Sequence, residues 1–242
     1  MRKIEKRAEP LELTEWRAAN QADPDGGGIN FGYDQLRQSP AVVNPLMDSL
    51  LAEQGGLCAY TGRRIDRGSS HIEHLLPQTP WKAQRGLDVT YSNMVACWPQ
   101  PNGPRGQYGA HPKEAWPTPG QEAQFVSPLN NGCEARFLFN QRGEIKSANP
   151  ADKAATTTIG KLKLDHKLLT ALRRSEIESV LGTMRGLSLK AARQRLKGIE
   201  EAEKALNGGA DMQLDPFCFA LKQALARFIK AGERIQKFSN PN

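Results

Sequence analysis

The sequence predicts an α+β protein in which a helix-poor core segment is followed by a helical C-terminal region. Residues 63–113 carry few helix signals, and residues 99–120 are rich in proline and glycine. From Thr158 onward, apolar residues recur at the spacing of amphipathic helices. Residues 1–20 mix charged and apolar residues, which predicts an ordered, helical N-terminal arm. We therefore expect a core with its arm in residues 1–158 and a helical region in residues 159–242.

The first elements after the arm are a loop and a helix. Residues 23–28 (Asp-Pro-Asp-Gly-Gly-Gly) predict a flexible loop. Asn44 followed by Pro45 is typical of a helix start, with asparagine as the N-cap and proline in the first helical position. An apolar stripe follows, and the pair Gly55-Gly56 predicts the end of this helix. Residues 57–62 then predict a tight turn.

Beyond the central segment, a β-hairpin and three helices are expected. Residues 135–145 predict the hairpin, with a glycine in its turn. The three amphipathic helices are opened by Asp165, by Ser188 and by Asp215-Pro216. Trp81, Trp98 and Trp116 are candidates for stacking on nucleobases, although core packing is the more probable role for at least two of them.

Composition narrows the classes of partner and compartment. The 242 residues can bury a sizeable core, and no apolar run approaches the length of a membrane span. Four unevenly spaced cysteines do not form a disulfide framework, which favours the cytoplasm. The net charge of +7 comes entirely from residues 159–242, which hold 16 basic and 9 acidic residues. This region suits nucleic acid or an acidic protein, and solvated lysine-rich helices are an equal alternative.

The candidate chemistry centres on Glu73 and His74. A phosphodiester is hydrolysed by an activated water together with a cation on the phosphoryl oxygens. At a strand end, these neighbouring side chains point to opposite faces, so that one can hold a metal ion while the other activates the water molecule. His71 shares a face with Glu73 and either helps to bind the metal or is a structural histidine.

Downstream residues can complete such a site. Asn93 can orient the histidine through its ring N–H or through a nearby backbone group. His111 can complete the metal site from the following element. The candidates for contact with the phosphate backbone are Lys82, Arg105 and Lys113.

The order Glu73-His74, then Asn93, then His111 resembles the HNH endonuclease motif. The wider pattern is similar to HNH proteins of the PtuB type, which belong to Septu and retron anti-phage systems. The segments that carry this resemblance are Gly56–Tyr60, His71–Gln78, Asn93–Cys97, Gly109–Lys113 and Thr158–Leu164. Together they extend over most of residues 1–185, with the loose spacing that is usual for HNH motifs.

The resemblance implies a ββα-metal fold with one divalent ion, Mg²⁺ or Mn²⁺. In that fold His74 would be the general base, Glu73 the metal carboxylate and Asn93 the orienting residue. His111 would be the last metal ligand, and Asn102 is a rival for that role. We prefer His111 because its Gly-x-His-x-Lys setting matches the closer family.

One departure from the family concerns structural zinc. Many relatives hold zinc with two pairs of cysteines that flank the active segment. Here Cys58 and Cys97 remain, whereas Thr61 and Tyr108 stand at the other two positions. Two thiolates form a poor zinc site unless His71 joins them, so we expect no structural zinc.

The resemblance further implies an effector nuclease of anti-phage defence. Its partners would be a PtuA-like ATPase and a retron reverse transcriptase with its RNA–DNA hybrid. DNA is the favoured substrate, and RNA, including tRNA, is the other option. The alternative function is a catalytically inactive HNH-fold subunit that binds nucleic acid or supports assembly. A third option is a zinc-ribbon-like structural module.

Overall fold

The computed structural model describes residues 1–21, 31–101, 103–182 and 187–239. It is a mostly helical α+β structure with two small two-stranded antiparallel sheets. The strands are β1 (His71–His74), β2 (Met94–Cys97), β3 (Phe137–Phe139) and β4 (Ile145–Ser147). The helices are α1 (Leu11–Gln21), α2 (Tyr33–Leu36), α3 (Pro40–Glu53), α4 (Gln78–Trp81), α5 (Ala110–Lys113), α6 (Lys153–Lys161), α7 (Lys167–Leu181), α8 (Leu189–Asn207) and α9 (Cys218–Ser239).

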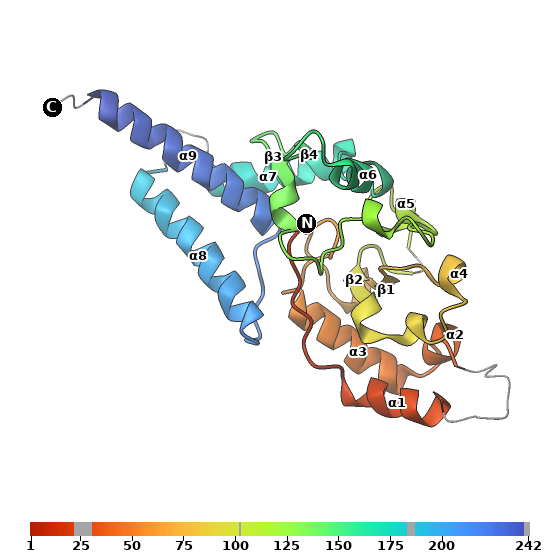
Figure 1. Ribbon diagram of the computed structural model, residues 1–242. Coiled ribbons are helices and arrows are strands. Elements are labelled where there is room, and N and C mark those ends of the chain that lie inside the picture. Colours follow the sequence, from red (N-terminus) through yellow and green to blue (C-terminus); the bar gives the residue numbers. More distant parts are fainter. Residues whose placement is uncertain (22–30, 102, 183–186, 240–242) are drawn as a thin grey trace.

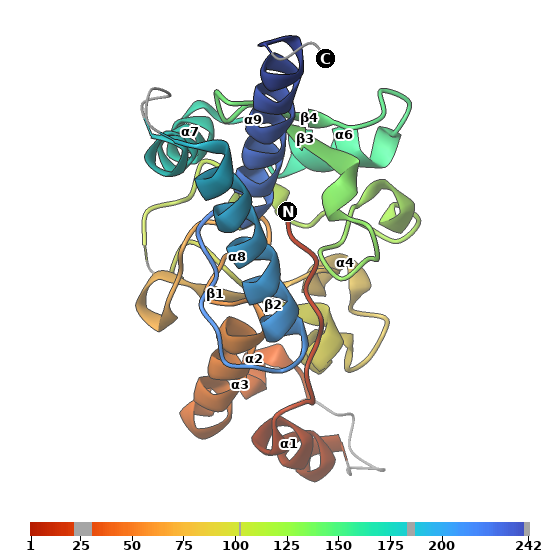
Figure 2. The same cartoon turned by 90° about the vertical axis from the view of Figure 1, so that its left-hand side faces the viewer.

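The two sheets lie in different parts of the molecule (Figure 1). β1 and β2 lie between the α1–α3 end and the α5–α7 end, whereas β3 and β4 lie beside α6 and α7. α8 and α9 run side by side in both views and project away from this body (Figure 2). Among the described residues, no helix combines the length and the apolar character needed to cross a bilayer.

Helix α3 begins earlier than the sequence predicts. Its N-cap is Ser39 and Pro40 occupies the first turn, so the predicted start at Asn44-Pro45 is wrong and Pro45 lies inside the helix. The extra turn buries Val42 on the core side of the helix. The free energy gained by this burial offsets the loss of the backbone hydrogen bond that Pro45 cannot donate. The predicted end is confirmed, because Gly55 follows the C-cap with a φ of 63°.

The C-terminal helices follow the prediction with small shifts. Ser188 caps α8 through a 3.1 Å bond from the Ala191 N–H, as expected. The cap of α7 is His166 rather than Asp165, and α9 begins at Cys218, three residues after Asp215. Asp215 instead contributes its backbone carbonyl, which accepts a hydrogen bond from the Cys218 N–H.

The predicted hairpin is confirmed as β3 and β4, with Phe137 opposite Ser147. Its turn packs tightly on α7, since a Cβ atom at Gly143 would lie 2.4 Å from the Thr170 carbonyl oxygen. The buried Arg173 guanidinium donates a 2.7 Å hydrogen bond to the carbonyl of Gly143. The hairpin is therefore held by α7 as well as by its own strand pairing.

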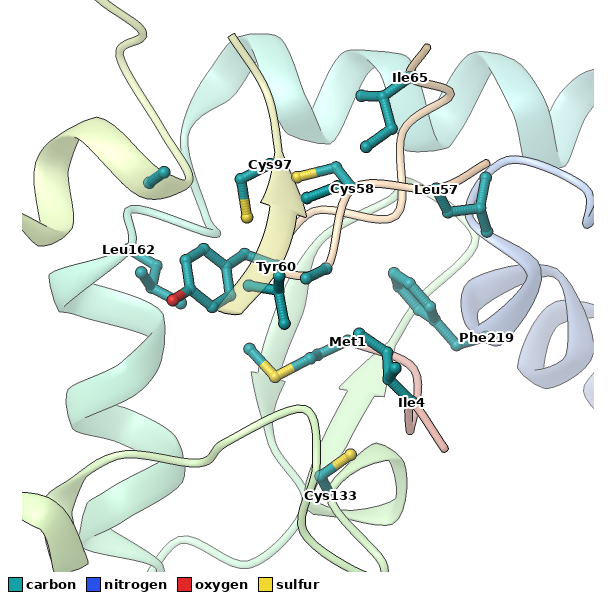
Figure 3. Close-up of a cluster of buried hydrophobic side chains, with 14 of the residues drawn as sticks. Met1, Ile4, Leu57, Cys58, Tyr60, Ile65, Cys97, Cys133, Leu162 and Phe219 are labelled. Carbon is teal, nitrogen blue, oxygen red and sulfur yellow. The ribbon is translucent and has the colours of Figure 1, made fainter. Parts of the chain in front are cut away.

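One hydrophobic core includes residues from both predicted parts of the chain. Figure 3 shows Met1 and Ile4 from the N-terminal arm packed near Leu162 and near Phe219 of α9. The Phe217 N–H donates to the Gly62 carbonyl, which ties the start of α9 to the turn at residues 57–62. The predicted division after residue 158 lies inside α6.

Buried polar side chains attach α3 to the β1–β2 sheet. The Gln54 side chain exchanges two hydrogen bonds of 2.7 and 2.8 Å with the Ala96 backbone, along the outer edge of β2. The Glu53 carboxylate accepts from Lys6 Nζ at 2.5 Å and from the Tyr91 hydroxyl at 2.7 Å. These bonds satisfy the edge of a short sheet that has only one partner strand.

Asp152 provides a test of helix capping and charge pairing. Its carboxylate caps α6 and accepts two bonds, of 2.5 and 2.7 Å, from Arg136. That ion pair lowers the pKa of Asp152 to about 2. Asp152→Asn preserves the cap but removes the ion pair, so it should lower the free energy of unfolding by about 1 kcal/mol at pH 7.

The pH dependence of this difference follows from the lowered pKa. The unfolded carboxyl has a pKa near 3.9, so the ion pair contributes above about pH 4 and its contribution is lost as the pH falls from about 4 to about 2. Urea unfolding of both proteins at pH 7 and near pH 2 measures the change. Glu178→Gln, which breaks an exposed pair with Arg174, is the control and should change stability less. An equal difference for Asp152→Asn at both pH values would contradict the assignment.

Candidate functional site

The four-residue strand β1 places the predicted active residues on its two faces. Glu73 pairs with Val95 of β2, and His74 pairs with Met94. Because side chains alternate along a strand, His71 and Glu73 share one face while Ile72 and His74 share the other. The predicted strand-end placement of the Glu73-His74 pair is confirmed.

A cavity of about 240 Å³ lies at the end of β1, and we call it the central pocket. Both Glu73 and His74 line it, together with Gln78, Thr79, Lys113 and Glu114 among others. Glu73 and His74 therefore border the same space, although their side chains leave β1 on opposite faces. This arrangement is the one that the sequence predicts for dividing metal binding from proton transfer.

The His74 ring is fixed by a backbone carbonyl and an aromatic ring. Its Nε2 atom lies 2.7 Å from the carbonyl oxygen of Asp88, and since that oxygen only accepts, Nε2 carries the proton. Nδ1 then holds the lone pair of the neutral ring. The Tyr33 ring packs edge-on at 4.6 Å between centroids. Burial lowers the pKa of His74, which keeps the imidazole neutral near pH 7.

Asn93 positions the loop that carries this carbonyl. Its side-chain oxygen accepts from the Leu76 N–H at 2.8 Å, and its amide donates to the carbonyls of Leu76 and Leu87 at 3.1 Å each. The loop between β1 and β2 is thereby fastened at both ends, which places Asp88 against His74. Of the two predicted modes, Asn93 uses contact with nearby backbone and does not contact the imidazole ring.

Glu73 lies between a lysine and a histidine. Its Oε1 atom is 2.9 Å from Lys113 Nζ, and its Oε2 atom is 3.6 Å from His71 Nε2. Although burial alone would raise the pKa of Glu73, the charges and hydrogen bonds of Lys113 and His71 together outweigh it and lower that pKa. The carboxylate is therefore ionised and presents Oε2 toward His71.

The predicted phosphate contact of Lys113 does not fit its burial. Its side chain is 1% exposed, and the ammonium donates to the carbonyl of His74 at 2.8 Å as well as pairing with Glu73. This lysine links the backbone of His74 to the carboxylate of Glu73. We therefore assign Lys113 to the internal support of the site.

The two remaining histidines differ in their hydrogen bonds. His71 Nδ1 donates to the carbonyl of Pro99 at 2.5 Å, and its Nε2 lies 3.6 Å from Glu73. Although burial alone would lower the pKa of His71, its hydrogen bond with Glu73 and the charge on that carboxylate raise it. His111 Nδ1 accepts from the Gly106 N–H at 2.7 Å, so its Nε2 carries the proton in the neutral ring. The ring centroids of the two histidines lie 5.8 Å apart. In its neutral form His71 has an Nε2 lone pair that a metal ion could use, whereas the neutral His111 ring presents an Nε2–H donor.

The site can be tested for its fit to a divalent ion. Two donors about 2.1 Å from one ion lie about 3.0–3.6 Å apart at angles of 90–120°, and the Glu73–His71 separation falls in that range. The Nδ1–H bond to Pro99 matches the second hydrogen bond that metal-binding histidines usually make. No group of three or more His, Cys, Asp and Glu side chains suited to a metal occurs within the described ranges. Mg²⁺ is commonly bound through one or two carboxylates together with water and phosphate, so a site with Glu73 as its carboxylate is compatible with this ion.

The other predicted contacts lie on either side of the central pocket. The exposed Arg105 pairs with Glu114 at 2.5 Å, and the exposed Lys82 lines a neighbouring cavity. Asn102, the rival of His111, lies outside the described residues. The Tyr60 hydroxyl donates to Glu73 Oε1 at 3.4 Å. Tyr33, Tyr60 and the carbonyls of Asp88 and Pro99 could not be predicted, because nothing in their local sequence shows that they face β1.

The cysteines of the predicted zinc positions meet in the core. Cys58 and Cys97 lie next to each other among apolar side chains (Figure 3). Although burial alone would raise the pKa of Cys58, hydrogen bonds from Cys97 and Thr61 lower it. At the fourth position, the Tyr108 ring stacks on Trp98 at 5.0 Å and its hydroxyl accepts from Arg63 at 2.9 Å. Aromatic packing fills the space that a fourth cysteine would face.

No protein-family model matches the chain, and a comparison with curated proteins gives no significant match.

The Glu73–Lys113 pair gives a stability prediction. Lys113→Met should lower the free energy of unfolding by about 3 kcal/mol, because it leaves a buried carboxylate without its cation. Adding Glu73→Gln should restore part of this loss, with a coupling energy of about 1–3 kcal/mol in a double-mutant cycle. Urea unfolding of the four proteins measures it. Strictly additive effects would show that the two side chains do not interact.

Proposed function

We propose that this chain is a metal-dependent nuclease of the HNH type, which hydrolyses phosphodiester bonds in nucleic acid. The observation that carries the proposal is the placement of Glu73 and His74 on opposite faces of β1, with both residues bordering the central pocket. Support also comes from the order of elements, since two antiparallel strands are followed by a short helix that carries His111 and Lys113.

In this proposal His74 is the general base. Its Nε2–H is held by the carbonyl of Asp88, so its Nδ1 lone pair is available to take a proton from a water molecule in the central pocket. Asn93 acts through the backbone, because it holds the loop that supplies this carbonyl. The tautomer is thus set by the fold before substrate binds.

The metal ligands in this proposal are Glu73 and His71. A bound Mg²⁺ or Mn²⁺ would supply positive charge to the phosphoryl and leaving oxygens. His111, with a proton on Nε2, can donate a hydrogen bond to a phosphate oxygen from the next element along the chain. The preference for His71 over His111 as a metal ligand comes from their hydrogen bonds, which the sequence does not reveal.

Substrate and partners follow from the resemblance and are part of the proposal. DNA is the favoured substrate, with tRNA or other RNA as the alternative. A PtuA-like ATPase, and in retron systems a reverse transcriptase with its RNA–DNA hybrid, would control the nuclease. The basic C-terminal helices are candidates for these contacts, since α8 and α9 project from the body of the protein (Figure 1). We keep the cytoplasm as its expected location.

The test is cleavage of plasmid DNA and of total tRNA by purified protein. Reactions contain Mg²⁺, Mn²⁺ or EDTA, with and without the partner ATPase. We expect metal-dependent cleavage, reduced about 10²- to 10⁴-fold in His74→Ala because the general base is lost. Glu73→Gln should raise the metal concentration needed for half-maximal cleavage, because a metal ligand is lost, and it should also lower the maximal rate.

Glu122→Gln is a matched control, because this glutamate is exposed and does not line the central pocket. It should leave cleavage unchanged. Circular dichroism and urea unfolding check that the variants fold. Intact DNA and RNA under every condition, or equal cleavage by wild type and His74→Ala, would contradict the nuclease and favour an inactive HNH-fold assembly subunit.

A further inference from the structure

A second cavity, of about 500 Å³, adjoins the central pocket, and we call it the Phe31 pocket. It lies between α2 and the segment from α4 to residue 88, and its walls include Phe31, Asp34, Trp81 and Arg85. It shares Gln78 and Thr79 with the central pocket. The volume is in the range of small-ligand sites, so it can take one planar group of nucleobase size.

The Phe31 ring is held in the wall of this pocket by contacts with neighbouring residues. It stacks on Trp16, with 6.1 Å between centroids and 16° between planes. Gly86 approaches its edge so closely that a Cβ atom there would lie 2.9 Å from a ring carbon. The Arg85 guanidinium lies 5.9 Å from the ring centroid, at the outer limit of cation–π contact. An aromatic ring beside a guanidinium is the surface on which nucleobases stack.

Polar groups suited to the edge of a base surround this surface. The walls carry the carboxylate of Asp34 and the amides of Gln78 and Gln84, which together offer donors and acceptors. Lys82, on the same wall, can neutralise a neighbouring phosphate. The pocket therefore combines a stacking face with hydrogen-bonding groups and a cation.

The wall of the Phe31 pocket is also joined to the catalytic histidine. Asp88 lines the pocket, its carboxylate accepts from the Tyr33 N–H at 2.8 Å, and its backbone carbonyl holds His74. A group bound in the Phe31 pocket thus lies against the same loop that sets the His74 tautomer.

A third cavity continues the path on the other side of the central pocket. It is lined by Arg105, Lys163 and His166 among others, and it shares Glu114 with the central pocket. The central pocket, which Glu73 and His74 border, therefore shares lining residues with both of the other cavities. A nucleic-acid strand in this row would have cationic groups for its phosphates at one end and a stacking pocket at the other.

We propose that the Phe31 pocket binds an unpaired nucleobase next to the scissile phosphate, so that the chain acts on single-stranded or looped nucleic acid. The inference rests on the proposed nuclease function, because it assigns the substrate class of that site. Bases inside a duplex are stacked and paired, and only an unpaired base can enter a side pocket. Neither DNA nor RNA is excluded by a stacking pocket, since every base has a π-face.

The test measures binding by the full-length His74→Ala protein, so that cleavage does not interfere. The probes are a fluorescein-labelled single-stranded 12-mer in DNA and in RNA form, the same strands with abasic positions, and the matching duplexes. We expect fluorescence anisotropy to show single strands binding at least about 10-fold more tightly than duplexes. Abasic strands should also bind about 10-fold more weakly than intact ones.

Pocket variants then locate the effect. Phe31→Leu preserves apolar contact with Trp16 but removes the flat ring, and it should abolish the difference between intact and abasic strands. Arg85→Ala should reduce that difference. Arg142→Ala is the matched control, because it removes an exposed arginine in the β3–β4 turn, and it should leave binding unchanged.

Three results would overturn the inference. They are equal affinity for duplex and single strands, an abasic penalty that survives Phe31→Leu, and no binding of any probe. Base-dependent binding that needs Phe31, in a protein whose wild type cuts no nucleic acid, would preserve this inference and refute the nuclease. Cleavage that is equally efficient on duplex and single strands would support the nuclease and refute the proposed binding of an unpaired base.

Discussion

The candidate site depends on the two-residue alternation of a single short strand. β1 has only four residues, yet its pleat sends Glu73 toward Lys113 and His71 while it sends His74 toward Tyr33 and Asp88. A shift of one residue in the pairing with β2 would exchange the two faces and dismantle both environments. The register of β1 against β2 is therefore the constraint that everything around the site must maintain.

Several buried polar groups maintain that register. Gln54 bonds to the outer edge of β2 through Ala96, and Asn93 fastens the loop that joins the two strands. Lys113 connects α5 to the carbonyl of His74 and to the carboxylate of Glu73. Each group is buried and satisfied, which is the condition under which polar contacts fix a unique geometry instead of weakening the core. A four-residue pair of strands cannot achieve this by its own hydrogen bonds.

The region around Cys58 and Cys97 shows how packing holds neighbouring elements together. These two cysteines join the turn at residues 57–62 to the end of β2, with Thr61 and the stack of Tyr108 on Trp98 beside them. Arg63 completes the stack by lying 4.3 Å from the Trp98 ring. The turn is also covered by α9, because a Cβ atom at Gly62 would lie 2.4 Å from the Phe219 ring. Packing from the C-terminal helices thus reaches the back of the candidate site.

Local signals in the sequence determined the elements that depend on neighbours in the chain. They predicted the β3–β4 hairpin, the cap of α8 at Ser188, the end of α3 at Gly55 and the placement of Glu73 and His74 on opposite faces. Caps, turns and alternation are set within a few residues, so a single sequence is enough to read them. The start of α3 was misjudged because burial of Val42, a tertiary effect, outweighed the local signal of Asn44-Pro45.

Tertiary structure alone decided the chemistry of the individual side chains. The tautomers of His71, His74 and His111 depend on Pro99, Asp88 and Gly106, and the burial of Lys113 depends on contacts between α5 and β1. The Phe31 pocket likewise joins residues from α2 and from the α4 segment, some 50 positions apart in the sequence. The residue types at β1 predict that a metal ligand and a general base can both be present there. Which ring nitrogen of each histidine donates and which accepts is set by hydrogen bonds between distant segments.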